Sequence, residues 1–156
     1  MHQLEHLYRD NAPALLAYFR RQPALAPGAE DLLQDTFVRA LRGFAQLSAS
    51  ASPRAYLFGI ARHVSIDAAR ARPPHAELPL DLPAPPAVAE DPRLELLRAA
   101  VTRLPDTHRE TLLLKLQQEL SYEEIAEVLA IPIGTVRSRL HHAVALLRAA
   151  LNPPVQ

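Results

Sequence analysis

The apolar positions in the first 72 residues recur every three or four residues, which is the period of α-helices with one buried face. Residues 4–19 predict a first helix or helix pair, interrupted near Asn11 and Pro13 and closed by residues 23–28. A second helix is predicted from residue 29, and a third from Ser52, a favoured cap that proline follows at the first helical position. The apolar residues expected inside these two helices are Leu33, Phe37, Ala40, Leu41, Phe44, Leu57, Ile60, Ala61 and Val64.

The same period returns from residue 92 onward. Two helices are predicted there, one carrying Leu94, Leu97, Val101 and Leu104 and the next carrying Leu112, Leu113 and Leu116, with Pro105 and Asp106 between them. Residues 121–151 then predict a short helix, a tight turn and a longer helix, which is the pattern of a helix-turn-helix.

Polar residues mark the two helix starts of this predicted motif. Ser121 and Glu124 have the spacing of a capping box at the start of the short helix, and Thr135 is expected to cap the longer helix after Gly134. Across the turn, the apolar residues expected to face one another are Ile125, Ala126 and Leu129 on the short helix and Val136, Leu140 and Val144 on the longer one.

Composition supports an all-α fold. Of the 156 residues 49% are hydrophobic, with 5% aromatic and no Trp, and the 4 glycines are too few for several β-hairpins. Residues 73–91 hold 6 of the 15 prolines together with four acids and no Lys or Arg, so they predict an acidic, proline-rich linker. We therefore expect two small helical domains, residues 1–72 and 92–151.

The formal net charge of +0 hides a division along the chain, because the acidic linker masks two mildly basic blocks. The absence of cysteine excludes disulfides and thiolate metal sites, and no apolar run resembles a signal peptide or a membrane-spanning helix. We expect a cytoplasmic protein without membrane insertion. No phosphate-binding loop, dinucleotide fingerprint, zinc-protease motif or nucleophile elbow is present, so we expect no catalytic activity, no cofactor and no metal.

The longer helix of the predicted motif presents a donor-rich surface at its start. In a helix-turn-helix this part of the second helix enters the major groove. The side chains that we expect to contact DNA there are Thr135, Arg137, Ser138, Arg139, His141 and His142. An amphipathic helical hairpin with a solvated basic face is the alternative interpretation of this pattern.

Three segments together resemble the extracytoplasmic-function (ECF) sigma factors of bacterial RNA polymerase. Residues 29–44 (AEDLLQDTFVRALRGF) resemble the family's region 2.2, and residues 53–72 (PRAYLFGIARHVSIDAARAR) resemble regions 2.3 to 2.4. Residues 120–148 resemble region 4.2, a motif that also occurs in other helix-turn-helix regulators. The order and spacing of the first two segments make the resemblance discriminating.

The resemblance implies partners for each segment. Core RNA polymerase would bind the polar stripe of region 2.2, formed by Asp31, Gln34, Asp35 and Val38. The minus-10 promoter element would be melted and held by the next segment through Arg54, Tyr56, Phe58, Arg62, His63 and Arg70. Region 4 would read the minus-35 element, and an anti-sigma factor is a further candidate partner.

The sequence departs from the family's pattern at several positions. Tyr56 stands where Trp is usual, His63 where Asn is usual, and Ala130 replaces a frequent turn glycine; His142 and Val144 occupy positions that are commonly Arg. Two other functions stay open on the sequence alone. One is a stand-alone helix-turn-helix regulator that binds duplex DNA without polymerase, and the other is a sigma-like protein that only sequesters a partner.

Overall fold

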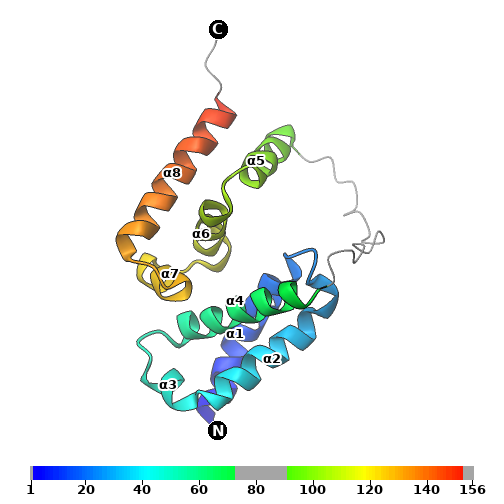
Figure 1. Cartoon of the computed structure of the whole chain (residues 1–156), viewed down its shortest axis with the longest axis vertical. Coiled ribbons are helices and arrows are strands. Elements are labelled where there is room, and N and C mark those ends of the chain that lie inside the picture. Colours follow the sequence, from blue (N-terminus) through cyan, green and yellow to red (C-terminus); the bar gives the residue numbers. More distant parts are fainter. Residues whose placement is uncertain (1, 73–90, 153–156) are drawn as a thin grey trace. The chain divides into compact units, whose positions relative to one another are not determined.

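A computed structural model describes residues 2–72 and 91–152, and all regular structure in these residues is helical (Figure 1). The all-α prediction is therefore confirmed. The elements in chain order are α1 (His2–Arg20), the short 3-10 helix η1 (Ala26–Gly28), α2 (Ala29–Arg42), α3 (Phe44–Ala49), α4 (Pro53–Ala71), α5 (Pro92–Thr102), α6 (Asp106–Gln118), α7 (Tyr122–Leu129) and α8 (Ile133–Leu151).

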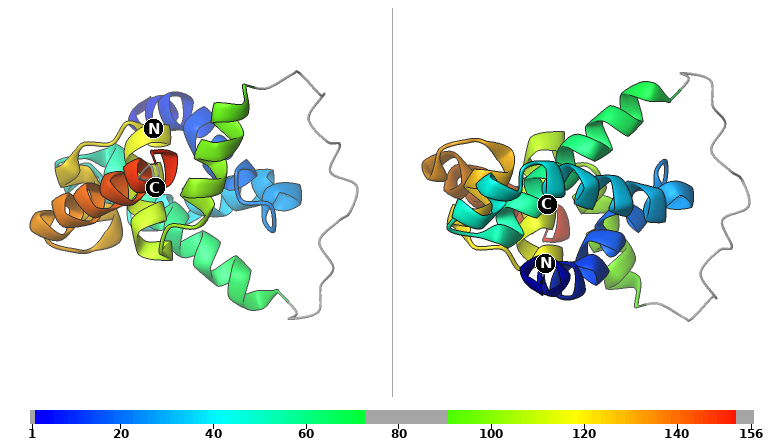
Figure 2. Two further views of the ribbon diagram at one scale, coloured as in Figure 1. Left: turned by 90° about the horizontal axis from the view of Figure 1, so that it is seen from above. Right: turned by 90° about the horizontal axis from the view of Figure 1, so that it is seen from below.

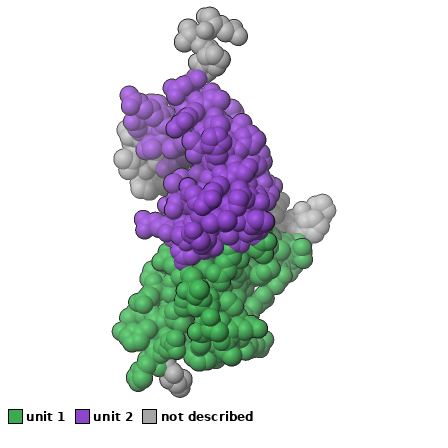
Figure 3. Space-filling view, turned by 90° about the vertical axis from the view of Figure 1, so that its left-hand side faces the viewer, with its two compact units in different colours: residues 1–80, 127–130 green, residues 81–126, 131–156 purple. Residues whose placement is uncertain are grey.

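The chain divides into two compact units, shown in different colours in Figure 3. The first comprises residues 1–80 with 127–130, and the second comprises residues 81–126 with 131–156. The proline-rich linker predicted at residues 73–91 lies outside the described residues except for Asp91, which caps α5. The domain limits predicted from the sequence stay predictions.

Helices α1, α2 and α4 pack against one another to form the first unit (Figure 1 and Figure 2). The ring of Tyr18 meets that of Phe58 edge to face, with centroids 5.8 Å apart. The apolar side chains buried in this unit include Leu15, Phe19, Leu33, Ala40, Leu57, Phe58, Ala61 and Val64. Most of the predicted core positions of α2 and α4 are thus confirmed, although Phe37 and Ile60 are only half-buried, as is Phe44 in α3.

The predicted interruption of the first helix is wrong, because α1 runs unbroken from His2 to Arg20 with Pro13 inside it. Proline at this position removes one backbone donor. The helix continues because its buried face carries on through Leu15 and Phe19 on the far side of the proline. Asn11 is also buried and donates its side-chain amide to the carbonyl of Leu7 at 2.9 Å, so it satisfies its polar group within the helix.

A second correction concerns Leu41, which was predicted in the core and is 55% exposed. The buried positions of α2 centre on Leu33, Thr36 and Ala40. Leu41 lies about 100° around the helix from Ala40, so it falls beyond the edge of the buried face. It lies next to Val38, which is 47% exposed.

In the second unit, α5 and α6 both pack against α8. Ala143 is completely buried and Val144 is 38% exposed, so Ala143 takes the inward place that was predicted for Val144. The reason is the helical period, since positions 136, 140 and 143 stay on one face while position 144 turns away. The predicted apolar residues of α5 and α6 that are instead exposed are Leu94, Leu97 and Leu116.

Of the two caps predicted for the helix-turn-helix, the structure contains the one at the start of α7 and lacks the one at the start of α8. The capping box of α7 is confirmed, since the backbone N–H of Glu124 donates to Ser121 Oγ at 3.1 Å and the backbone N–H of Ser121 donates to Glu124 Oε1 at 3.0 Å. The predicted cap at Thr135 is wrong, because α8 already begins at Ile133. The backbone N–H of Thr135 donates to the carbonyl of Pro132 within the first turn.

Candidate nucleic-acid and protein interfaces

The exposed side of α2 carries the stripe that was predicted to bind a protein partner. Asp31 and Gln34 are exposed and Asp35 is half-buried, and Val38 continues the same face. These positions lie within about 100° of one another around the helix axis. The structure therefore brings all four together, and it adds the exposed Leu41, which the sequence predicts in the core. The stripe is a polar surface with two adjacent apolar side chains at one end.

Asp35, the half-buried acid of this stripe, is paired with Arg39 of the same helix. Arg39 donates to both carboxylate oxygens of Asp35 at 3.3 Å, and it donates from Nη1 to Asp67 Oδ2 of α4 at 3.0 Å. The hydrogen bond to Asp67 raises the pKa of Arg39 above its ordinary value. Burial opposes this rise, and the hydrogen bond to Asp35 and the charges of both carboxylates add to it. Asp31 and Gln34 are then the polar side chains of the stripe that are most available to a partner.

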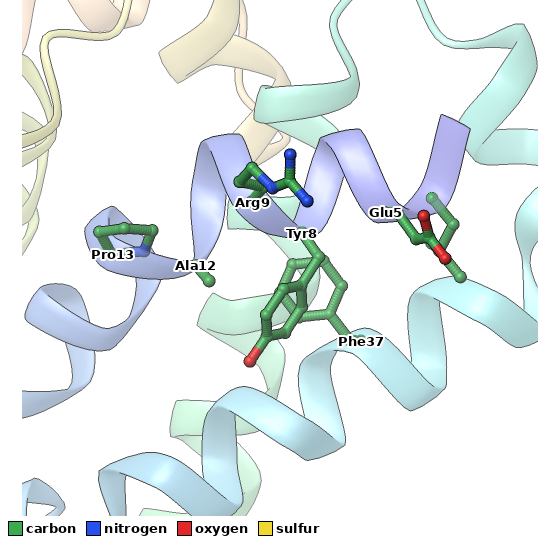
Figure 4. A pocket seen from close by; sticks show the side chains of 7 residues that line it. Glu5, Tyr8, Arg9, Ala12, Pro13 and Phe37 are labelled. Carbon is green, nitrogen blue, oxygen red and sulfur yellow. The ribbon is translucent and has the colours of Figure 1, made fainter. Parts of the chain in front are cut away.

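A shallow apolar hollow lies between α1 and α2, beside this surface (Figure 4). It has a volume of about 620 Å³, and the rings of Tyr8 and Phe37 that line it meet at a tilt of 58° with centroids 4.7 Å apart. Glu5 and Arg9 border it on α1 (Figure 4). These two opposite charges leave the rim without a net charge.

The residues predicted to contact the minus-10 element divide between two faces of α4. Tyr56, His63 and Arg70 are spaced by seven residues, so they lie along one stripe. This stripe is the outward side of the helix, with His63 and Arg70 exposed and Tyr56 half-buried. Arg54 and Arg62 are half-buried and lie nearer the buried face. The structure thus brings three of the six residues together on an accessible surface.

Phe58 belongs to the core, which rules out its predicted stacking on a base. Its side chain is 1% exposed and contacts the ring of Tyr18, so no face of the ring is open to a nucleotide. The guanidinium of Arg54 lies over it, with Cζ 5.6 Å from the ring centroid. Phe58 and Arg54 therefore help to hold the helix in the unit rather than forming its outer surface.

Tyr56 is anchored at the junction of α2 and α3. Its hydroxyl donates to Gln46 Oε1 at 3.1 Å. The hydroxyl also lies so close to Gly43 that a Cβ added there would be 2.7 Å from it. Glycine at this junction therefore leaves room for the tyrosine, and the hydrogen bond fixes the direction of the ring at the start of α4.

The first three turns of α8 present most of the predicted DNA-contacting side chains to the surface. Arg137, Ser138, His141 and His142 are exposed, whereas Thr135 and Arg139 are half-buried. Opposite them, Val136, Leu140 and Ala143 are buried. Arg137 and His141 lie on one flank of the exposed face, and Arg139 and His142 lie on the other, with Ser138 between the two flanks.

His142 has a neighbour that the sequence analysis did not identify. Nε2 of His108, in the first turn of α6, lies 3.1 Å from Nδ1 of His142. The two rings meet edge to face, with centroids 4.9 Å apart. No local sequence pattern links these residues, which are 34 positions apart, because the contact depends on the packing of α6 against α8.

Comparison with known proteins matches both units to parts of one family. Residues 7–73 match Sigma-70 region 2, and residues 94–147 match Sigma-70, region 4. The chain is 35% identical over 150 residues to the RNA polymerase sigma factor YlaC of Bacillus subtilis (strain 168), a match that covers 90% of this chain and 87% of that protein. It is 30% identical over 141 residues to the ECF RNA polymerase sigma factor SigW of the same strain, covering 80% of this chain and 75% of SigW.

The fold is also similar to that of the sigma factor RpoE from Bartonella quintana, solved in complex with the anti-sigma factor NepR. The TM-score is 0.74 at 24% sequence identity, and the match covers 99% of this chain and 100% of RpoE. With regions 2 and 4 both present and in this order, the protein is an RNA polymerase sigma factor that directs promoter-specific initiation. The chain belongs to the sigma-70 family, in its ECF group.

None of the helices in the described residues has the length and apolar character that crossing a membrane requires.

Proposed function

We propose that this sigma factor binds core RNA polymerase through the exposed face of α2 and promoter DNA through the outer face of α4 and the start of α8. One observation supports this proposal above all. On each of the three helices, accessible residues predicted to contact polymerase or DNA lie on the side opposite the buried face. Of the minus-10 candidates, Tyr56, His63 and Arg70 form the accessible group, and Phe58 is left out because it is buried. The half-buried Arg54 and Arg62 stay candidates for contact at the edge of this surface.

The α2 face suits a protein partner because it combines polar side chains with a small apolar centre. Asp31 and Gln34 offer acceptors and an amide, while Val38 and Leu41 offer apolar area that water otherwise covers. Asp35 contributes differently, because Arg39 already holds its carboxylate. A partner that approaches this face meets the Asp35–Arg39 pair as a dipole rather than as a free negative charge.

The α8 face suits duplex DNA because its exposed side chains are donors without an acid among them. Arg137, on one flank, is the candidate for base contact in the major groove, and Arg139, on the other flank, is the candidate for a phosphate. Replacing Arg137 with Ala should therefore cost about 1 to 3 kcal/mol on the cognate minus-35 sequence and relax discrimination at one or two base pairs. Replacing Arg139 with Ala should weaken all sequences alike.

The division of roles between domains is part of the same proposal. Residues 1–72 would bind polymerase and the minus-10 element, residues 92–151 would bind the minus-35 element, and residues 73–91 would join them as a linker. We further propose a cytoplasmic protein that acts by binding, without catalysis of its own. An anti-sigma factor is the candidate regulatory partner, by analogy with proteins of this fold such as RpoE.

Core binding tests the proposal at its first step. A variant with Asp31→Lys and Val38→Asp changes the available part of the α2 face and leaves Asp35 with Arg39. It should fail to co-purify with core polymerase while its helical circular dichroism is retained. Asp10→Lys makes the same substitution as Asp31→Lys at an exposed position of α1, so it is the control and should bind as the unmodified chain does. Binding of the double variant at the unmodified yield would contradict the assignment.

A further inference from the structure

Two imidazole rings and a hydroxyl form a short chain of polar contacts along one side of α8. Thr107 Oγ1 lies 3.1 Å from Nδ1 of His108, whose Nε2 lies 3.1 Å from Nδ1 of His142. The far nitrogen of His142, Nε2, completes the chain on an exposed side chain. Arg139 lies one turn before His142 on the same flank and acts electrostatically on His108.

One proton lies between Nε2 of His108 and Nδ1 of His142. Which of these two nitrogens carries it decides whether Nε2 of His142, the outer nitrogen, is a donor or an acceptor. If Nε2–H of His108 donates to His142, a neutral His142 must carry its own proton on Nε2 and present a donor to the surface. If Nδ1–H of His142 donates instead, a neutral His142 presents a bare acceptor. Thr107 accommodates both arrangements, because its hydroxyl either donates to Nδ1 of His108 or accepts from it.

The surroundings favour a neutral His108. Burial lowers the pKa of His108 below its ordinary value, and the nearby His142 and Arg139 lower it further. A neutral ring keeps one donor and one acceptor nitrogen, so His108 is able to hold His142 in either arrangement. A phosphate oxygen only accepts hydrogen bonds, and it therefore selects the arrangement in which His142 donates outward.

We propose that His108 is a positioning residue, which holds the ring of His142 and directs its outer Nε2–H toward a phosphodiester oxygen of duplex DNA. The inference rests on the proposed DNA-binding face of α8 and adds a residue from α6 to it. It also explains how a histidine serves where the family commonly has arginine. Arginine donates in several directions at once, whereas a neutral imidazole has one donor that must be aimed.

Binding of the full-length chain to a fluorescein-labelled, mixed-sequence DNA duplex tests the inference, because a phosphate contact does not require the cognate sequence. His142→Ala should weaken binding about three- to tenfold, the value of one net hydrogen bond. His108→Leu should weaken it by a similar factor, and His108→Gln should restore most of the loss, since a glutamine amide donates from about the place of Nε2. His6→Leu, an exposed histidine of α1, is the control and should have no effect.

The double variant His108→Leu, His142→Ala separates positioning from direct contact. If His108 acts through His142, the double variant binds as weakly as His142→Ala alone.

Nitrogen NMR of the imidazole rings gives a second readout, which a general loss of structure would not reproduce. On addition of duplex, His142 should carry its proton on Nε2 in the unmodified chain and in His108→Gln, and become a mixture of tautomers in His108→Leu.

The failures are distinguishable. A chain that binds the duplex normally when His108 is Leu, or a glutamine variant as weak as the leucine variant, overturns the positioning role and leaves the proposed function intact. An unmodified chain that does not bind duplex at low salt overturns the proposed DNA-binding face of α8, and the inference with it.

Discussion

Arg39 of α2 donates a hydrogen bond to Asp67 of α4 at 3.0 Å, and this ion pair links the candidate polymerase-binding helix to the candidate DNA-binding helix. Asp67 lies four residues after His63, next to the outer stripe of α4. Its negative charge is paired with this arginine of α2. The same arginine also forms an ion pair with Asp35, so one side chain partly neutralises an acid on each of the two surfaces.

Removing the charge of Asp67 should strengthen DNA binding without a large loss of stability. The pair is partly exposed, and such pairs contribute at most about 1 kcal/mol to the free energy of unfolding. We expect Asp67→Asn to raise the affinity of the holoenzyme for promoter DNA at low salt and to steepen its salt dependence, because the α4 surface gains positive charge. Asp10→Asn on α1 is the control. An affinity equal to that of the unmodified protein would show that the outer stripe of α4 does not face the DNA.

Gly43 and Tyr56 should be energetically coupled. In Gly43→Ala the new Cβ displaces the tyrosine hydroxyl, and the hydrogen bond to Gln46 is lost, at a cost of about 0.5 to 1.5 kcal/mol in urea unfolding. Tyr56→Phe should cost a similar amount. The double variant should lose little more than either single change, because the alanine then meets no hydroxyl. Additive losses would mean that the two residues do not share this contact.

The features predicted correctly from the sequence are those that nearby residues determine. The cap at Ser52 and the capping box of Ser121 and Glu124 depend on residues three apart, and both are present. The stripe on α2 follows from the helical period alone. Leu41 and Val144 were misplaced for the same reason, since each lies one position beyond the buried arc of its helix.

The contacts and burial that the sequence does not predict depend on which helices pack together. The Arg39–Asp67 and His108–His142 contacts join residues 28 and 34 positions apart, and no sequence pattern pairs them. Phe58 was assigned to DNA because its segment resembles a DNA-melting region, yet its contact with Tyr18 places it in the core. A resemblance identifies the segment that acts, whereas packing decides which side chains of that segment are accessible.

Ala130 departs from the glycine that is frequent at the turn, and the structure gives this departure an energetic consequence. Its φ is 54°, in the left-handed region that disfavours a side chain. Ala130→Gly should therefore raise the free energy of unfolding by about 0.5 to 1 kcal/mol. The matched control is Ala145→Gly, at an exposed position within α8, which should lower it by about 1 kcal/mol. If both substitutions lower the free energy of unfolding, Ala130 is not strained at the turn.

Stability should depend on pH through His108. Its pKa is lowered in the folded protein by burial, His142 and Arg139, so the unfolded chain binds a proton more readily. The contribution of His108 to stability is then fully present above the ordinary histidine pKa of about 6.5 and is lost as the pH falls through the folded value. Unfolding midpoints measured between about pH 7.5 and 5.5 should fall less steeply for His108→Gln than for the unmodified chain. Equal slopes would contradict this role of His108.

The central claim is that this chain makes core RNA polymerase start transcription at a defined site, and run-off transcription with purified core polymerase tests it most directly. Core alone and core with the Asp31→Lys, Val38→Asp variant should give no discrete product, whereas the unmodified chain and the Asp10→Lys control should each give one transcript of fixed length. Because a stand-alone DNA-binding regulator does not confer initiation on core, that transcript requires a sigma factor. The absence of a discrete transcript from every genomic promoter fragment tested, with the unmodified chain bound to core, would contradict the claim.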